Sequence, residues 1–194
     1  MTGAIRRGAP GARGVRGVRP QPALALVRRR VAVEHLGWVE ITAHAQGLCE
    51  VVVCSLGDHS RLRAQTLDGP HRVLDQTERY LQAYGRSHVR HGRARRLPAP
   101  PPLDLAQLSS FTRDVLAATS SIPFGAFLTY GGVARLLGRP KAARAVGQAL
   151  GRNPIAIIIP CHRVLAHQGV GGFGSGLPIK LMLLELEDIA AGSR

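Results

Sequence analysis

The sequence has few cysteines and lacks any long apolar run. Its three cysteines, Cys49, Cys54 and Cys161, are an odd number without the spacing of a disulfide framework or a paired zinc site. No segment reaches the apolar length of a membrane span, and residues 1–30 lack the hydrophobic core of a secretory signal. We therefore expect a soluble protein of a reducing, intracellular compartment, with no membrane association.

Acidic residues are also scarce. The chain has 12 Asp and Glu against 26 Lys and Arg, for a formal net charge of +14, and every cation except Lys141 and Lys180 is an arginine. Arginine pairs with phosphate through two parallel hydrogen bonds, so such an excess favours a polyanionic partner. A compositional bias of the genome would replace lysine by arginine without removing acids, and nucleic acid is thus the favoured partner.

The first 30 residues differ from the rest of the chain. Residues 1–30 hold eight arginines and no acid, with glycine and proline too frequent for a helix or strand to persist. The composition predicts a disordered basic arm. Three interpretations stay open: a tether to DNA, an organelle targeting peptide, or a leader translated from a wrongly assigned start. The last two together are slightly favoured.

Residues 31–91 are predicted to form a small α/β domain. The stretches "GWVEITAHA" and "LCEVVVCSL" are β-branched and partly alternating, and Gln46-Gly47 between them predicts a hairpin. A helix ending at Gly85 should follow. Its apolar face is Val73, Leu74, Thr77, Tyr80, Leu81 and Tyr84. Residues 92–102, rich in arginine and proline, read as a surface linker between domains.

Residues 103–190 are predicted to be mostly helical. One helix should begin near Ser109 or Ser110, and the last should have Pro178 in its first turn. Between them, helices over 131–137 and 141–150, joined by Gly138-Arg139-Pro140, form a helix-turn-helix pattern. The second of this pair would turn one face inward: Ala142, Ala145, Val146, Ala149 and Leu150.

The outer face of that second helix is basic and carries small residues. Lys141, Arg144 and Gln148 lie together there, bordered by Ala143 and Gly147. Small side chains beside cations allow close approach to a phosphate-lined groove. An ordinary solvated basic face explains the pattern equally well.

The stretch "NPIAIIIPCHRV" joins an apolar run to three reactive or charged residues. We expect a strand over 155–159 that stops at Pro160 and leaves Cys161 at the mouth of a pocket. A thiol is nucleophilic as its thiolate, which a neighbouring base or cation such as His162 or Arg163 can favour. Taken alone, a Cys-His pair is more often structural than catalytic.

Several motifs in order resemble one family. "TYGGVARLLGRPKAARAVGQAL", "GRNP", "IPCHRV" and "GGFGSGLPIKLMLLELE" are similar to the O6-alkylguanine-DNA alkyltransferases, also called methylated-DNA–protein-cysteine methyltransferases. The similarity is high from Phe111 to Glu187 and weaker back to Val33. It implies a ribonuclease H-like α/β domain followed by a helical, DNA-binding domain over 103–190.

The resemblance also implies a function. The protein would repair O6-alkylguanine, and with it O4-alkylthymine, by irreversible single-turnover transfer of the alkyl group without a cofactor. It would act as a monomer on double-stranded DNA entered through the minor groove. Its location would be the cytoplasm with the nucleoid, or the nucleus in a eukaryote.

Site residues follow from the same resemblance. Cys161 would accept the alkyl group, His162 would act as its base through a water, and Glu187 would polarise the imidazole from the flank of the last helix without being fully buried. Asn153 would brace the turn before the active-site segment. Arg144 would enter the duplex in place of the flipped nucleotide, flanked by the small Ala142, Ala143 and Gly147 and by Lys141 and Gln148.

The base pocket would be lined by Tyr130, Val164, Phe173, Gly174 and Ser175. Tyr130 would help to turn the nucleotide out and would donate a hydrogen bond to the guanine ring. The family usually has a tyrosine where this chain has Phe173, which keeps the stacking face and loses the hydroxyl. Backbone N–H groups of Gly174 and Ser175 could still bind O6, so we expect altered affinity and retained chemistry.

No metal site is predicted, although some relatives bind a structural zinc in the N-terminal domain. Cys49 and Cys54 are five apart in a predicted strand and thus on opposite faces, which argues against a shared metal ion. We interpret both as core residues. His44 and His59 are no better candidates for metal ligands. Three alternative functions stay open: an alkyltransferase-like lesion-binding protein, an alkylation-sensing regulator and a cysteine hydrolase. Retention of Cys161 argues against the first.

Overall fold

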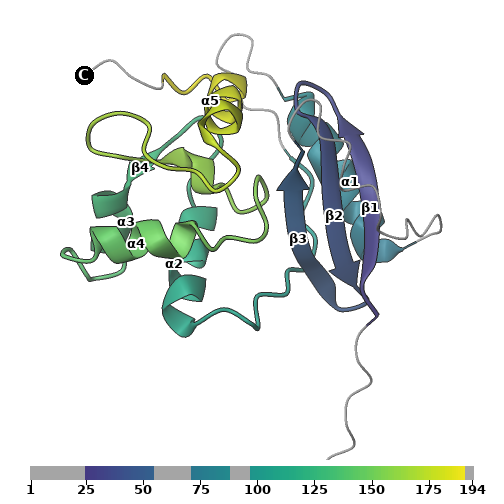
Figure 1. The fold of residues 1–194 in the computed structure, drawn as a ribbon, viewed down its shortest axis with the longest axis horizontal. Coiled ribbons are helices and arrows are strands. Elements are labelled where there is room, and N and C mark those ends of the chain that lie inside the picture. The colour runs from purple at the N-terminus through teal and green to yellow at the C-terminus, as the bar shows by residue number, and fades with distance from the viewer. Residues whose placement is uncertain (1–24, 55–70, 88–96, 191–194) are drawn as a thin grey trace, which may run out of the picture.

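The computed structural model describes residues 25–54, 71–87 and 97–190 (Figure 1). Most of the predicted basic arm, part of the linker and His59 lie outside these ranges. Among the described residues, no helix is both long and apolar enough to cross a membrane.

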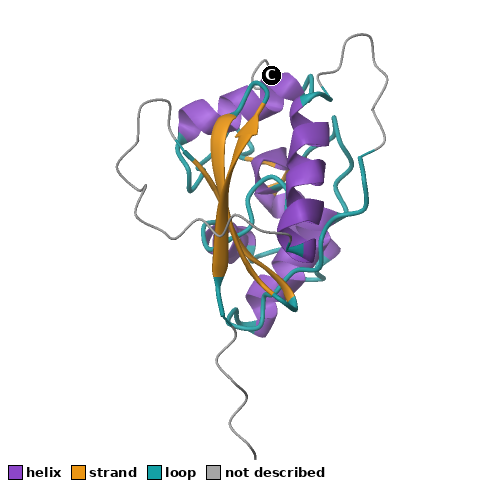
Figure 2. Ribbon diagram, turned by 90° about the vertical axis from the view of Figure 1, so that its right-hand side faces the viewer, coloured by secondary structure: helices purple, strands orange, loops and turns teal. Residues whose placement is uncertain are grey.

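The N-terminal unit is a three-stranded antiparallel sheet with one helix. Strands β1 (Val27–Val33), β2 (Gly37–His44) and β3 (Gly47–Val53) lie in the order β1-β2-β3, and helix α1 (Arg72–Gly85) packs across them (Figures 1 and 2). His44 pairs with Gly47 across the predicted turn, which confirms the hairpin. The six residues predicted for the apolar face of α1 are all buried, because their spacing follows the 3.6-residue period.

The boundary of the basic arm was predicted too late in the chain. Strand β1 begins at Val27, so residues 27–30 belong to the sheet. Arg29 explains why a basic stretch is ordered here: its guanidinium lies 2.7 Å from Asp75 and 3.0 Å from Glu78, both on α1. Charge composition alone could not reveal partners that lie more than forty residues away.

The described part of the C-terminal unit contains four α-helices and a pair of two-residue parallel strands. The helices are α2 (Ser110–Ser120), α3 (Tyr130–Leu136), α4 (Ala143–Leu150) and α5 (Leu177–Leu186), and the strands are β4 (Leu128–Thr129) and β5 (Val164–Leu165). Ser109 caps α2 by accepting a hydrogen bond from the Thr112 N–H, as predicted. Helices α3 and α4 contact each other directly, as the helix-turn-helix pattern requires.

Helix α4 begins two residues later than predicted. Lys141 and Ala142 lie in the turn before it, where the Ala142 N–H donates to the Arg139 carbonyl at 2.8 Å. Ala142 has a ψ of 16°, outside the helical range, so it caps the helix instead of joining it. Of the predicted inward face, Val146, Ala149 and Leu150 are buried, whereas Ala142 and Ala145 are only half-buried.

The apolar run before Pro160 is a buried turn and not the predicted strand. Ile157 has a φ of 71°, a left-handed conformation that ends extended pairing. Around it the N–H groups of Ile158 and Ile159 donate to the carbonyls of Ala156 and Ile155 at 2.8 and 3.0 Å. The β-branched residues of this run predicted a strand. Five consecutive apolar residues have no period, however, and fit a buried turn as well as a buried strand.

The two units share an interface and a continuous hydrophobic core. The Val51 N–H of β3 donates to the Pro154 carbonyl at 2.8 Å, immediately before the buried turn. The Leu48 N–H donates to Pro102, and the Asp104 N–H donates back to Leu48, each at 2.8 Å. The edge strand β3 is therefore covered on its open side by chain from the C-terminal half.

Candidate active site

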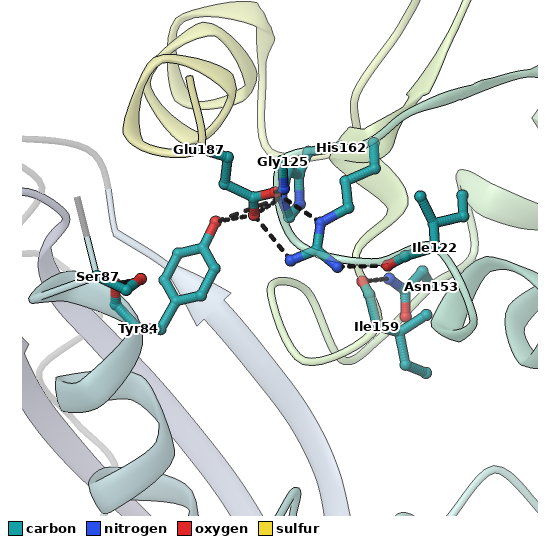
Figure 3. Close-up of polar contacts among 9 residues, drawn as sticks. Tyr84, Ser87, Ile122, Gly125, Asn153, Ile159, His162 and Glu187 are labelled. Carbon is teal, nitrogen blue, oxygen red and sulfur yellow. Dashed lines mark hydrogen bonds and ion pairs between the residues drawn. The ribbon is translucent and has the colours of Figure 1, made fainter. Parts of the chain in front are cut away.

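Cys161 begins a short 3₁₀ helix, Cys161–Arg163, that follows the buried turn. Its side chain is 8% exposed. The Asn153 side-chain amide donates to the Ile159 carbonyl at 3.0 Å (Figure 3). It also donates to the Cys161 Sγ at 3.0 Å, while the Asn153 Oδ1 accepts from the Ile155 N–H. One asparagine thus holds both the turn and the sulfur, which fits the predicted bracing position.

The thiol is held in its neutral form. Burial raises the pKa of Cys161, and the Asn153 hydrogen bond and the charge of Lys180 offset only part of this effect. Because the thiolate is the reactive species, Cys161 needs a base that removes its proton when a substrate is bound.

His162 and Glu187 form a fully buried pair. His162 Nε2 lies 2.7 Å from Glu187 Oε1, and the two side chains have no exposed surface (Figure 3). Burial lowers the pKa of His162 even though Glu187 opposes this effect, so the imidazole is neutral at neutral pH. With Nε2–H donating to the carboxylate, the lone pair lies on Nδ1, which has no hydrogen-bond partner among the described residues.

Glu187 is more deeply buried than predicted and accepts hydrogen bonds from several groups. It caps α5, 1% exposed, with its carboxylate turned inward and not left on the helix flank. Arg163 donates from Nε to Oε2 at 2.7 Å and from its second terminal nitrogen to Oε1 at 3.0 Å. The hydroxyl of Tyr84 donates to Oε1 at 2.6 Å, and the Gly125 N–H to Oε2 at 3.3 Å.

Glu187 is ionised despite its burial. Desolvation alone would raise its pKa, but hydrogen bonds from His162 and Arg163 and the charge of Arg163 outweigh it and lower the pKa of Glu187 to about 2. A permanent negative charge next to the imidazole can stabilise the imidazolium that forms when His162 takes a proton.

Three buried residues at the site were not assigned a role from the sequence. Arg163 was named only as a neighbouring cation, and Tyr84 only as part of the apolar face of α1. Lys180 lies on α5 with no exposed surface, and its ammonium donates to the carbonyls of Val164 at 2.8 Å and Gly172 at 3.1 Å. Burial lowers the pKa of Lys180 to about 8. A single lysine in the apolar run "LPIKLMLL" was the available signal.

A cavity of about 260 Å³ opens at Cys161. Tyr130, Phe173 and Gly174 lie in its wall, as predicted. The remaining lining residues are Gly147, Leu150, Gly151 and Gly172. Val164, which is fully buried in β5, and Ser175 do not line this cavity, so the structure does not bring these two to the wall where they were expected.

Helix α4 connects the cavity with the predicted DNA-binding face. Arg144 and Gln148 are exposed on it, and Lys141 is exposed in the turn before it. Gly147 lies on the same helix and lines the cavity, where an added Cβ would lie 3.7 Å from the Tyr130 ring, an ordinary van der Waals contact.

Only one group of three metal-ligating side chains occurs in the described ranges. It comprises His44, Cys49 and Asp104, whose ligand atoms lie within 4.8 Å of one another. His44 Nε2 is 2.8 Å from Asp104 Oδ2, a hydrogen bond that satisfies both groups. Asp104 is distant in sequence from His44 and Cys49, so no spacing pattern indicated it as a metal ligand.

Cys49 and Cys54 are half-buried and not in the core, so the prediction that they are core residues is wrong.

Comparisons with known proteins agree on one family. Residues 110–189 match a family model described as 6-O-methylguanine DNA methyltransferase, DNA binding domain. A methylated-DNA–protein-cysteine methyltransferase of Methanosarcina acetivorans is 52% identical over 80 residues, which cover 41% of this chain and 51% of that protein. The match thus spans about half the length of the curated relatives.

Solved structures extend the similarity over most of the chain. The Mycobacterium tuberculosis O6-methylguanine methyltransferase is 31% identical, with a TM-score of 0.63 over 87% of this chain and 96% of that one. The M. tuberculosis OGT in complex with DNA is 34% identical, with a TM-score of 0.63 over 82% of this chain and 91% of that one. The likeness therefore includes the N-terminal sheet as well as the helical unit.

Proposed function

Because the chain belongs to the family of methylated-DNA–protein-cysteine methyltransferases, we propose that it repairs O6-alkylguanine in DNA by transferring the alkyl group to its own Cys161. One observation carries this proposal: Cys161 lies in a cavity wall directly before a buried His162–Glu187 pair. O4-alkylthymine, which carries its alkyl group on an equivalent exocyclic oxygen, is a second substrate.

Deprotonation of the thiol is the first step. Glu187 holds Nε2–H of His162, so Nδ1 accepts the Cys161 proton through one water molecule, and the ionised carboxylate stabilises the resulting imidazolium. The raised pKa of the buried thiol supports this order, because the nucleophile forms only when the base acts. Asn153 keeps the sulfur oriented by donating to it.

Alkyl transfer then takes place in a single displacement. The sulfur forms a bond to the alkyl carbon, the bond from that carbon to O6 breaks, and the electron pair remains on guanine. Guanine takes up a proton with the help of the hydroxyl of Tyr130, a neutral donor because burial raises its pKa. The product is a thioether, which thiols do not reduce or exchange, so each chain acts once and needs no cofactor.

Access to the substrate requires that the nucleotide leave the duplex. The O6 substituent is out of reach of a protein thiol inside the base stack, so the nucleotide must turn into the cavity at Cys161. Arg144 takes its place in the stack, and Ala142, Ala143 and Gly147 allow α4 to enter the minor groove while Lys141 and Gln148 contact the backbone. The exposure of Arg144 and Gln148 and the position of Gly147 at the cavity support this mode.

Inside the cavity the base stacks on Phe173. Gly174 lies beside Phe173 in the cavity wall, and its N–H binds O6. The missing hydroxyl at position 173 alters affinity and leaves the displacement intact.

We infer further that the protein acts as a monomer on double-stranded DNA, in the cytoplasm with the nucleoid or in a nucleus. We also infer that the N-terminal unit is a reduced ribonuclease H-like domain. The antiparallel order β1-β2-β3 with one helix packed across the sheet supports that inference.

Intact-protein mass spectrometry after incubation with O6-methylguanine DNA tests the proposal. We expect one methyl mass per chain, located on Cys161 by peptide mapping. The variant Cys161→Ala should bind the same DNA and gain no mass. Release of many product equivalents per chain would refute single-turnover transfer and would instead fit a cysteine hydrolase, whereas binding without any mass gain would fit a lesion-binding protein.

A further inference from the structure

The N-terminal unit contributes one side chain to the His162–Glu187 pair. Tyr84, in the last turn of α1, is fully buried, and its hydroxyl lies 2.6 Å from Glu187 Oε1 and 3.3 Å from His162 Nε2. Figure 3 shows its ring reaching from α1 toward the carboxylate. The other donors to Glu187, which are His162, Arg163 and Gly125, all come from the C-terminal half.

We propose that Tyr84 is a positioning residue for the alkyl transfer, an inference that depends on the proposed function. Oε1 is the carboxylate oxygen that His162 uses, and the Tyr84 hydroxyl reaches this same atom. Together with Arg163, which donates to Oε1 at 3.0 Å, the phenol therefore restrains where Oε1 lies relative to Nε2. A fixed Oε1 fixes the tilt of the imidazole and the direction in which Nδ1 points.

The phenol can act only as a neutral donor. Burial and the charge of Glu187 together raise the pKa of Tyr84 well above its usual value, so its proton stays on oxygen. A hydrogen bond from a hydroxyl to a carboxylate is charge-assisted and therefore strong and directional. Such a bond restrains Glu187 more tightly than packing alone would.

The position of the phenol depends on how the sheet and α1 are joined. Gly85 lies so close to the turn between β1 and β2 that a Cβ there would be 2.6 Å from the Glu34 carbonyl oxygen. The Ser87 hydroxyl donates to the Tyr84 carbonyl at 2.5 Å, and the Tyr84 ring packs edge-on against Phe124 at 5.9 Å between centroids. The N-terminal unit thereby holds the end of α1 against the C-terminal site.

The test is Tyr84→Phe in the full chain, which removes one oxygen and keeps the ring. We expect the single-turnover transfer rate at saturating O6-methylguanine DNA to fall about tenfold, the size typical of a lost hydrogen bond to a charged group. The dissociation constant for the same DNA should stay within about twofold, because α4 and the cavity are unchanged. In ¹⁵N-histidine NMR spectra, the His162 ring signals should shift.

Tyr80→Phe is the matched control. Tyr80 is buried one turn earlier on α1, and its hydroxyl makes no hydrogen bond to Glu187 or His162. This variant should keep the rate and the His162 signals. In a Glu187→Gln background, Tyr84→Phe should have little further effect on the rate, because the two changes disrupt the same contact.

Three results would overturn the proposal. The first is a Tyr84→Phe protein with wild-type rate and unchanged His162 signals. The second is an equal loss of rate in Tyr84→Phe and Tyr80→Phe. The third is failure of Tyr84→Phe to fold while Tyr80→Phe folds, which would assign the hydroxyl to stability. Failure of the proposed function itself is distinguishable, because the wild-type chain would then gain no methyl mass.

Discussion

Replacing Glu187 by glutamine should cost stability as well as activity. The amide cannot carry the negative charge that His162, Arg163 and Tyr84 now share, and its NH₂ group would face donors. Arg163, 5% exposed, would lose its ion-pair partner and remain as a buried charge. Removal of one member of a buried pair typically destabilises a protein by about 3–5 kcal/mol.

The lowered pKa of Glu187 gives a second value for the loss in the free energy of unfolding. A folded pKa of about 2 against the ordinary 4.5 is a difference of about 2.5 units, or about 3 kcal/mol at roughly 1.4 kcal/mol per unit. Because the folded pKa lies below the unfolded one, this stabilisation is complete above about pH 4.5 and is lost as the pH falls toward 2. Near pH 3 less than half of it should remain.

Urea denaturation of wild type and Glu187→Gln at pH 7, 4 and 3 measures both quantities. The difference in unfolding free energy should be about 3–5 kcal/mol at pH 7 and should shrink steadily as the pH falls. Glu185→Gln, the same chemical change at an exposed position of α5, is the control and should have little effect. A difference below about 1 kcal/mol at pH 7, or one that does not change with pH, would refute the account of Glu187 as a buried, ionised acceptor.

Two further predictions concern DNA. Arg144→Ala should slow transfer on duplex DNA far more than reaction with free O6-benzylguanine, since a free base needs no flipping. Arg135→Ala, a change at an exposed position of α3, serves as the control. Equal losses on both substrates would mean that Arg144 supports the fold. Deletion of residues 1–24, which leaves β1 and the Arg29 ion pairs intact, should not change repair in the mass assay. If the deletion instead flattens the plot of log DNA affinity against log salt concentration, the five deleted arginines contact phosphate.

The hydrophobic periodicity of the sequence predicted the helices and strands of this chain better than it predicted where each of them begins and ends. The buried face of α1 and the Ser109 cap of α2 follow from local spacing and side-chain chemistry, and both are confirmed. The strand predicted over 155–159 is wrong, because a run without polar residues has no period and Ile157 adopts a left-handed conformation inside the core. The start of β1 was missed because Arg29 in this basic stretch pairs with two acids on α1 that are distant in sequence.

The roles expected of Cys161, His162 and Asn153 came from the resemblance of several motifs to one family. The residues themselves lie within ten positions and meet in one turn, where Asn153 donates to the Cys161 Sγ. Taken alone, however, a Cys-His pair is more often structural than catalytic. Lys180 could have been recognised as a lone cation on an apolar helix face.

Only the tertiary structure decided how Glu187 is held. Its carboxylate accepts from Tyr84, which is 103 positions earlier in the chain, as well as from His162 and Arg163. Docking of the sheet unit against the helical unit brings these groups together and removes water from them. Burial then makes each hydrogen bond to the carboxylate strong enough to keep it ionised with a pKa of about 2, a balance that no local pattern of residues contains.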